Sequence, residues 1–175
     1  MTLTRTTISR QIFAALVALV CAVLLPQACH MIGAALGVHS ALGEILLPMH
    51  LPVLIVGFLA GPLAGALAGV LSPMVSAMIT GMPAMTILPF MCVELCLYGL
   101  VAGLLKAASM PNVVKVLAAQ VLGRLGRAAV ILLCVSVLHI SAVNPMIVLT
   151  SIAVGLPGII LQWIVIPVVL RYAGA

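Results

Sequence analysis

Three residues of this chain could form a charged site inside an otherwise apolar protein: Glu94, Arg124 and Arg127. Glu94 lies in the apolar run 88–100, and a carboxylate in the apolar part of a membrane costs roughly 2.5–3.5 kcal/mol unless it has a partner or a water-filled cavity. Arg124 and Arg127 are one helical turn apart on one face. The set predicts either an ion pair that fixes helix packing or a pocket for an anion. The surplus of positive charge favours the pocket.

The composition indicates a membrane protein. Hydrophobic residues make up 66% of the 175 residues, charged residues make up 5%, and the mean hydropathy is +1.47. These values exclude a soluble globular domain and a disordered chain. At about 20 residues per span, the length allows five or six transmembrane helices and no soluble domain. The net charge of +5 is scattered without a basic run, so nucleic acid is not an expected partner.

Apolar runs and turn residues predict an all-α, six-helix transmembrane bundle that forms one domain, residues 1–175. The expected helices cover residues 9–26, 48–60, 63–80, 88–105, 113–137 and 145–170. The first helix is expected to end at Pro26, which leaves 27–47 as an outer lid loop. This helix is interpreted as retained and not as a cleaved signal peptide, because equally apolar segments follow it.

Basic residues predict the orientation of the bundle. With six helices both termini lie on one side, and five basic residues fall on that side, whereas the opposite loops carry no Lys or Arg. The five are Arg5, Arg10, Lys106, Lys115 and Arg171. By the positive-inside rule the termini are cytoplasmic, and the segments 27–47, 81–87 and 138–144 lie outside.

The expected helices also predict how deep the charged residues lie. At about 1.5 Å of rise per residue, Glu94 and Arg127 both lie roughly 9 Å below the outer edge of the apolar layer, and Arg124 lies about one turn deeper. The helices that carry them are consecutive and joined by a short connection. Glu94 is therefore expected to pair with Arg127 or Arg124.

A second group of polar residues lies in and beside the expected lid: His30, His39, Glu44 and His50. Histidines that bind metal from one helix are spaced three or four apart, whereas these are 9 and 11 apart, so no metal site is predicted. Two interpretations remain open. The histidines either bind a substrate from a mobile lid, or they are ordinary solvated and capping residues.

The cysteines and the small residues carry weaker signals. Five cysteines lie mostly in apolar runs without a CxxC motif, which indicates reduced packing residues. Cys29, His30 and Met31 are all side-chain types that bind haem or corrinoid metals axially. Stripes of small residues at intervals of four let helices approach closely. The glycine stripe is expected to pack within the chain, and the alanine stripe packs there or against a partner: Gly61, Gly65 and Gly69; Ala14, Ala18 and Ala22.

An ordered set of motifs runs through the chain from Leu47 onward. In order they are Pro48-Met-His-Leu-Pro52, Gly57-Phe-Leu-Ala-Gly61-Pro62, Ser72-Pro73, Thr80-Gly-Met-Pro83, Glu94-Leu, Tyr98-Gly-Leu-Val-Ala-Gly-Leu104, Gly123-Arg124 and Pro157-Gly-Ile-Ile-Leu-Gln162. With these motifs the chain resembles the substrate-binding S-components of energy-coupling factor (ECF) vitamin importers over nearly its whole length.

This resemblance implies a six-helix subunit of a prokaryotic cell membrane with both termini cytoplasmic. It also implies a substrate pocket near the outer face, covered by the loops after the first, third and fifth helices. The alanine stripe (Ala14, Ala18, Ala22) would dock on a transmembrane T-subunit coupled to two cytoplasmic ATPases. The chain has no GxxxxGK[ST] loop, so it is not expected to be an enzyme or to hold a cofactor, and the partners would hydrolyse ATP.

Two features narrow the substrate. Nickel and cobalt members use an N-terminal Met-His pair, whereas this chain begins Met1-Thr2 and its Met49-His50 pair is internal, which argues against a free metal ion. Flat aromatic vitamins need stacking rings, and only Phe90 and Tyr98 are expected near the pocket. Methionines would supply an adaptable aliphatic wall: Met74, Met78, Met82, Met85 and Met91.

The first expectation is therefore an anionic, largely aliphatic micronutrient, such as pantothenate or lipoate, held by Arg124 or Arg127. The second is a metal-containing tetrapyrrole met by His30, Cys29 or Met31. The residues expected to bind substrate are Arg127, Arg124, Glu94, Tyr98, His30, His39, His50, Met82 and Phe90. Two other classes stay open: a membrane enzyme, for which no convincing nucleophile or metal set is found, and an assembly subunit in which Glu94 and Arg127 serve only packing.

Overall fold

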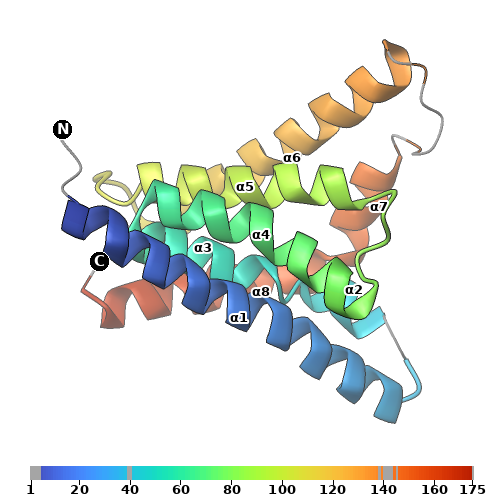
Figure 1. Ribbon diagram of the computed structural model, residues 1–175, viewed down its shortest axis with the longest axis horizontal. Coiled ribbons are helices and arrows are strands. Elements are labelled where there is room, and N and C mark those ends of the chain that lie inside the picture. Colours follow the sequence, from blue (N-terminus) through green and yellow to red (C-terminus); the bar gives the residue numbers. More distant parts are fainter. Residues whose placement is uncertain (1–4, 39–40, 138, 140–143, 145, 175) are drawn as a thin grey trace.

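The computed structural model describes residues 5–38, 41–137, 139, 144 and 146–174, and these residues form helices and connections without a strand (Figure 1). The predicted all-α class is confirmed. The helices are α1 (Arg5–Ala35), α2 (Ala41–Leu46), α3 (His50–Ala60), α4 (Pro62–Thr80), α5 (Leu88–Leu104), α6 (Asn112–Ser136), α7 (Ile147–Val154) and α8 (Leu156–Tyr172).

Among the described residues, four stretches are long and apolar enough to cross a membrane: Ile8–Ala35, Ala41–Ala60, Pro62–Thr80 and Asn112–Ser136. The bent pair α7 and α8 makes a fifth if it counts as one span. Helix α5 is also apolar but has only 17 residues. The predicted count of six spans, with the termini in the cytoplasm, therefore stays a prediction.

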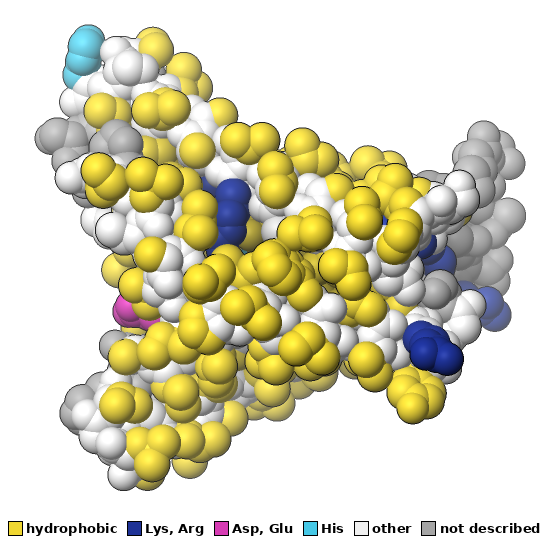
Figure 2. Space-filling model, turned by 180° about the vertical axis from the view of Figure 1, so that it is seen from behind, with side chains coloured by type: hydrophobic (Ala, Val, Ile, Leu, Met, Phe, Trp, Pro, Cys, Tyr) yellow, Lys and Arg dark blue, Asp and Glu magenta, His cyan; other side chains and the backbone are white. Residues whose placement is uncertain are grey.

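The bundle has two different ends. Helix α1 begins and α8 ends at the same end, where the α5–α6 connection also lies, and we call this the termini end (Figure 1). The α4–α5 connection lies at the opposite end, which we call the cavity end. Hydrophobic side chains cover most of the face shown in Figure 2, and basic side chains gather mainly at one end of it. The apolar outer surface suits a lipid environment.

The closest helix packing joins α4 to α5. A Cβ added to Gly65 would overlap the backbone of Gly99, and a Cβ added to Gly99 would overlap Gly65. Gly69 meets the backbone of Leu95 in the same way. Small residues permit this approach, which maximises van der Waals contact between helices in lipid. Packing within the chain is confirmed for Gly65 and Gly69.

The alanine stripe of α1 is also used within the chain. Ala18 and Ala22 are buried in the main hydrophobic core, and Ala14 packs partly against it, because α1 lies on α3 and α4. The T-subunit interface predicted for Ala14, Ala18 and Ala22 stays a prediction, and of the three only Ala14 is partly exposed in this chain. The outward face of α1 carries large apolar side chains instead, including Phe13, which is 70% exposed.

The prediction that the first helix ends at Pro26 is wrong, because α1 continues to Ala35 with Pro26 inside it. Proline removes one backbone hydrogen bond, and membrane helices tolerate this loss where neighbouring groups compensate. The helix ends instead near Gly37, whose φ of 74° is a left-handed conformation that glycine adopts without strain. The expected lid loop 27–47 is correspondingly wrong: its first part belongs to α1, and its last part forms α2.

The expected last helix, 145–170, is in fact two helices bent by 59° at Gly155. Pro157 lies in the first turn of α8, where its missing N–H costs nothing. Added Cβ atoms on Gly155 and Gly158 would crowd Leu47 and the backbone of Leu46, so the bend seats α8 directly against the α2–α3 junction. The other expected helices match the observed ones to within about two residues.

At the termini end of the bundle, polar side chains form hydrogen bonds with backbone groups at or near the ends of helices. Gln11 Oε1 accepts a hydrogen bond from the N–H of Ala64 in the first turn of α4, at 3.3 Å. Lys106 Nζ donates to the carbonyl of Leu59 near the end of α3, and Lys115 Nζ donates to the carbonyl of Lys106 at 3.3 Å. Terminal N–H and C=O groups lack partners inside their own helices, so these contacts satisfy a buried N–H group of α4 and two carbonyl groups that are less buried.

Candidate functional site

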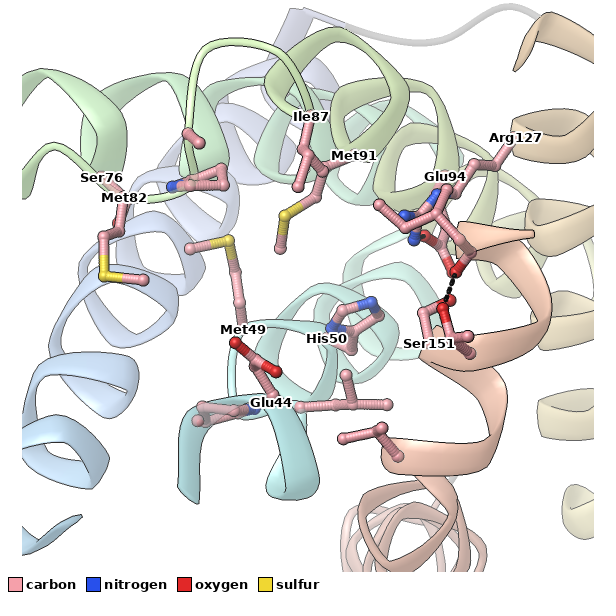
Figure 3. A pocket seen from close by; sticks show the side chains of 18 of the residues that line it. Glu44, Met49, His50, Ser76, Met82, Ile87, Met91, Glu94, Arg127 and Ser151 are labelled. Carbon is pink, nitrogen blue, oxygen red and sulfur yellow. Dashed lines mark hydrogen bonds and ion pairs between the residues drawn. The ribbon is translucent and has the colours of Figure 1, made fainter. Parts of the chain in front are cut away.

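A cavity of about 650 Å³ lies at the cavity end of the bundle (Figure 3). Helices α1 to α7 and the connection between α4 and α5 all contribute to its wall. The lining residues are Gln27, His30, Gly43, Glu44, Leu47, Pro48, Met49, His50, Ser76, Met82, Pro83, Ala84, Ile87, Met91, Glu94, Arg124, Arg127, Ile147, Thr150, Ser151 and Val154.

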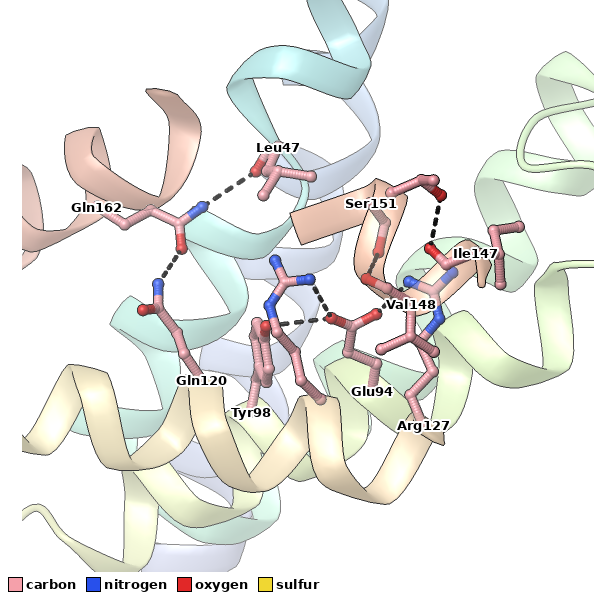
Figure 4. A network of polar contacts seen from close by, with 11 residues as sticks. Leu47, Glu94, Tyr98, Gln120, Arg127, Ile147, Val148, Ser151 and Gln162 are labelled. Atoms are coloured by element: carbon pink, nitrogen blue, oxygen red, sulfur yellow. Dashed lines mark hydrogen bonds and ion pairs between the residues drawn. The ribbon is translucent and has the colours of Figure 1, made fainter. Parts of the chain in front are cut away.

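The charged part of the wall is built around Glu94, which is 1% exposed. Arg127 Nη1 donates to Glu94 Oε2 at 2.7 Å, and the hydroxyl of Tyr98 donates to Glu94 Oε1 at 3.1 Å (Figure 4). Arg124 Nη1 lies 3.7 Å from Oε1, within ion-pair range but beyond a hydrogen bond. The predicted pairing is therefore present with both arginines, and Arg127 holds the closer position.

The close fit of α6 on α5 explains this arrangement. Gly123 faces the ring of Tyr98, and Gly126 faces Leu97, and a side chain at either glycine would overlap these neighbours. The two glycines bring the backbone of α6 near to α5, and the arginines that follow them reach Glu94. The Gly123-Arg124 step was noted from the sequence only as a motif. A Cβ at Gly123 would also lie 2.9 Å from the carbonyl oxygen of Glu94, so this glycine limits the distance between the helices that carry the charges.

The charges around Glu94 do not cancel. One carboxylate faces two guanidinium groups, so the cluster carries one net positive charge. Arg124 has no hydrogen bond to Glu94, and its side chain is 12% exposed. The buried Nε of Arg127 also has no hydrogen-bond partner among the described residues. Such unpaired donors beside a cavity are the chemistry that binds a carboxylate or another anion.

His50 lies next to this cluster, at the start of α3, and is 5% exposed. Its ring meets the ring of Tyr98 edge-on, with 5.4 Å between the ring centres. Nδ1 of His50 is buried without a hydrogen-bond partner among the described residues. His50 therefore keeps hydrogen-bonding capacity at the cavity wall, and Figure 3 shows it between Glu44 and Glu94.

A network of three buried or half-buried polar side chains supports the cavity from outside. Trp163 Nε1 donates to Gln120 Oε1 at 2.7 Å. Gln120 Nε2 donates to Gln162 Oε1 at 2.8 Å, and Gln162 Nε2 donates to the carbonyl of Leu47 at 3.4 Å (Figure 4). Leu47 has a φ of 49°, a left-handed conformation that is costly for a leucine. The network ties this strained junction between α2 and α3 to α6 and α8.

Six of the nine residues expected to bind substrate line the cavity: His30, His50, Met82, Glu94, Arg124 and Arg127. Tyr98 lies behind Glu94, and Phe90 is buried without lining the cavity, so the expectation that Phe90 contacts substrate is not supported. His39 lies outside the described residues.

The predicted methionine wall is only partly present. Met82 and Met91 line the cavity, together with Met49, whereas Met78 is 84% exposed on the outer surface. Met74 and Met85 are exposed as well. Of the Cys29-His30-Met31 tripeptide, only His30 lines the cavity, because consecutive helix residues point about 100° apart. The tripeptide therefore does not offer three ligands to one metal.

Several lining residues were missed by sequence analysis, among them Gln27, Ser76, Thr150 and Ser151. Gln27 follows the proline that was expected to end its helix, so its place on a helix face was not foreseen. The polar residues Gln120 and Gln162 are unusual inside apolar helices, and this signal could have identified them as a buried pair.

Comparison with known proteins bears on the same residues. No curated protein and no solved structure matches this chain. The family described as "ECF transporter, substrate-specific component" matches residues 7–170, which is nearly the full length and includes every residue of the cavity wall. The chain belongs to the family of ECF transporter substrate-specific components.

Proposed function

We propose that this chain captures a small anionic, largely aliphatic micronutrient in the cavity for ATP-driven import across a prokaryotic cell membrane. ECF substrate-specific components are substrate-binding membrane subunits and not enzymes themselves. A T-subunit and two cytoplasmic ATPases would supply the energy for uptake. The observation that carries the proposal is the cluster of Glu94 with two arginines at the cavity wall.

Within this cluster the two arginines have different roles. Arg127 is hydrogen-bonded to Glu94, which neutralises the buried carboxylate and fixes its position together with Tyr98. Arg124 lies at ion-pair distance only, so its N–H groups are available to a substrate carboxylate. Charge-assisted hydrogen bonds of this kind contribute roughly 1.5–3 kcal/mol each. Glu94 acts as the counter-ion and not as the ligand.

The rest of the wall favours an aliphatic substrate. Flexible or branched apolar side chains line it, including Met49, Ile87, Met91, Ile147 and Val154. Phe, Tyr and Trp are absent from the described lining residues, so a flat aromatic vitamin would have no ring for stacking apart from the imidazoles of His30 and His50. Pantothenate and lipoate combine a carboxylate with a mainly aliphatic body, and they remain the preferred candidates.

The test is binding of pantothenate and lipoate to the purified protein, measured by isothermal titration calorimetry. Arg124→Ala should weaken binding of the acid at least tenfold, because the substrate carboxylate loses its charged partner. Arg171→Ala is the matched control, since Arg171 lies at the far end of α8 and does not line the cavity. Equal affinity in Arg124→Ala and the unmodified protein would contradict the proposal.

A further inference from the structure

The cavity contains a second polar group that the anion site does not use. Gln27 and His30 lie one turn apart on α1, and Glu44 lies on the short helix α2. A Cβ added to Gly43 would lie 2.9 Å from Cε1 of His30, so the imidazole packs directly on the backbone of α2, next to Glu44. The three side chains therefore line one region of the wall.

This group lies across the cavity from the arginines. Helix α1 packs mainly on α2, α3 and α4, whereas α6 packs mainly on α5, α7 and α8. Figure 3 shows Glu44 and Arg127 on different sides of the cavity, with His50 between them. The apolar side chains of Met49 and Met91 fill parts of the wall around them. The cavity is thus polar at two separate places, with His50 between them and apolar side chains over much of the remaining wall.

The two polar places also differ in charge. The only lysine or arginine side chains among the lining residues are Arg124 and Arg127, and both already face Glu94. Glu44 lines the cavity, is exposed, and has no ion pair within the described part of the chain. An ionised carboxylate only accepts hydrogen bonds, and no described lining cation is paired with this one. His50, buried with an unpartnered Nδ1, lies between the two charges.

From this geometry, and resting on the proposed function, we infer that the substrate carries a hydrogen-bond donor at the end remote from its acid group. The acid group meets Arg124, the aliphatic middle crosses the methionine-lined space, and the far end donates to Glu44 beside His30 and Gln27. The far group is a hydroxyl or an amine. This places a hydroxylated acid of the pantothenate type ahead of an acid with an apolar end of the lipoate type.

The inference is tested with three acids that share one chain length and differ only at the far end: octanoate, ω-hydroxyoctanoate and ω-aminooctanoate. Their binding to the purified protein is measured by calorimetry in the same detergent and buffer. The hydroxy and amino acids should bind about tenfold more tightly than octanoate, because each can donate to a carboxylate. Glu44→Ala should reduce this ratio to about one, while Arg171→Ala should keep it.

The outcomes separate the inference from the proposed function. If the unmodified protein binds all three acids equally, or if Glu44→Ala keeps the preference, the inferred contact between a substrate donor and Glu44 is wrong. The proposed anion site at Arg124 is not affected by that result. If Arg124→Ala leaves the affinity for all three acids unchanged, the anion site itself is wrong. Binding of none of them would overturn both. Glu44 is exposed on a six-residue helix, and thermal unfolding of Glu44→Ala checks that the fold is kept.

Discussion

The same helices pack closely at one end of this bundle and surround a cavity at the other. At the termini end, α5 presents Gly99 and Gly103, and its backbone contacts α3 and α4 directly. Toward the cavity end, the same helix presents Met91 and Glu94, and the surrounding helices leave a space of about 650 Å³. The comparison teaches that one bundle can combine close backbone packing in one half with a charged cavity in the other.

Substitutions in the charged half should lower the stability of the protein more than substitutions in the glycine-packed half. Glu94→Ala leaves Arg124 and Arg127 buried without their counter-ion, and breaking a buried pair in this way costs about 3–5 kcal/mol of stability. Thermal unfolding in detergent should show a large fall in Tm. The double variant Glu94→Leu/Arg127→Met removes the closer pair together and should recover part of the loss. A Tm unchanged by Glu94→Ala would mean that solvent, and not Glu94, compensates the arginines.

The glycine-packed half should respond to a single methyl group. Gly99→Ala forces the backbones of α4 and α5 apart and should cost about 1–3 kcal/mol, measured as a loss of Tm. Gly126→Ala is the matched control: its added methyl group meets only the flexible end of the Leu97 side chain, so the cost should be smaller. If Gly126→Ala proves the more harmful, the α4–α5 contact does not set the rigidity of this end.

Two buried glutamines, one at each end of the bundle, allow the two ends to be compared directly, and the expected effects are the smallest of this series. Gln162→Leu removes the hydrogen bond to Leu47 and leaves Nε2 of Gln120 without an acceptor, although Oε1 of Gln120 keeps its bond from Trp163. The change should cost about 1–2 kcal/mol and also weaken ligand binding by loosening the α2–α3 junction. Gln11→Leu removes the cap on Ala64 and should cost about as much stability without changing affinity. Titration of pantothenate into both variants measures the difference.

A more conservative replacement of Gln162 tests whether the hydrogen bond to Leu47 positions the site. Gln162→Glu retains an oxygen that can accept from Gln120 but loses the N–H group that reaches Leu47. If both Gln162→Leu and Gln162→Glu bind pantothenate as tightly as the unmodified protein, the network stabilises the fold without positioning the site.

The charged site could be predicted from the sequence because the electrostatic cost of an unpaired charge in an apolar helix is large and depends on nearby residues. A carboxylate in an apolar run needs a partner, and only two arginines lie inside the apolar helices at a matching depth. The bounds of α4, α5 and α6 were also close, because a proline marks the start of each helix and Gly81 marks the end of α4. These features depend on residue type and spacing, which a sequence contains.

The features that could not be predicted depend on which helix faces meet in three dimensions. Pro26 looks like a helix end, yet the helix continues through it. Ala18 and Ala22 form a stripe that suits a partner equally well, and only the position of α1 on α3 and α4 shows that the stripe is buried. Gln27 and Glu44 reach one cavity because α1 extends past Pro26 and α2 folds back beside it, which periodicity alone does not specify.

The methionines of the cavity wall have a consequence for how the protein withstands oxidants. Met82 is 42% exposed, whereas Met49 is buried. Peroxide would convert the sulfur of Met82 to a sulfoxide first, which places a polar, chiral group where the wall now offers a soft hydrocarbon surface. Reduction of the sulfoxide would restore that surface, so the shape and polarity of this part of the wall would follow the oxidation state of Met82.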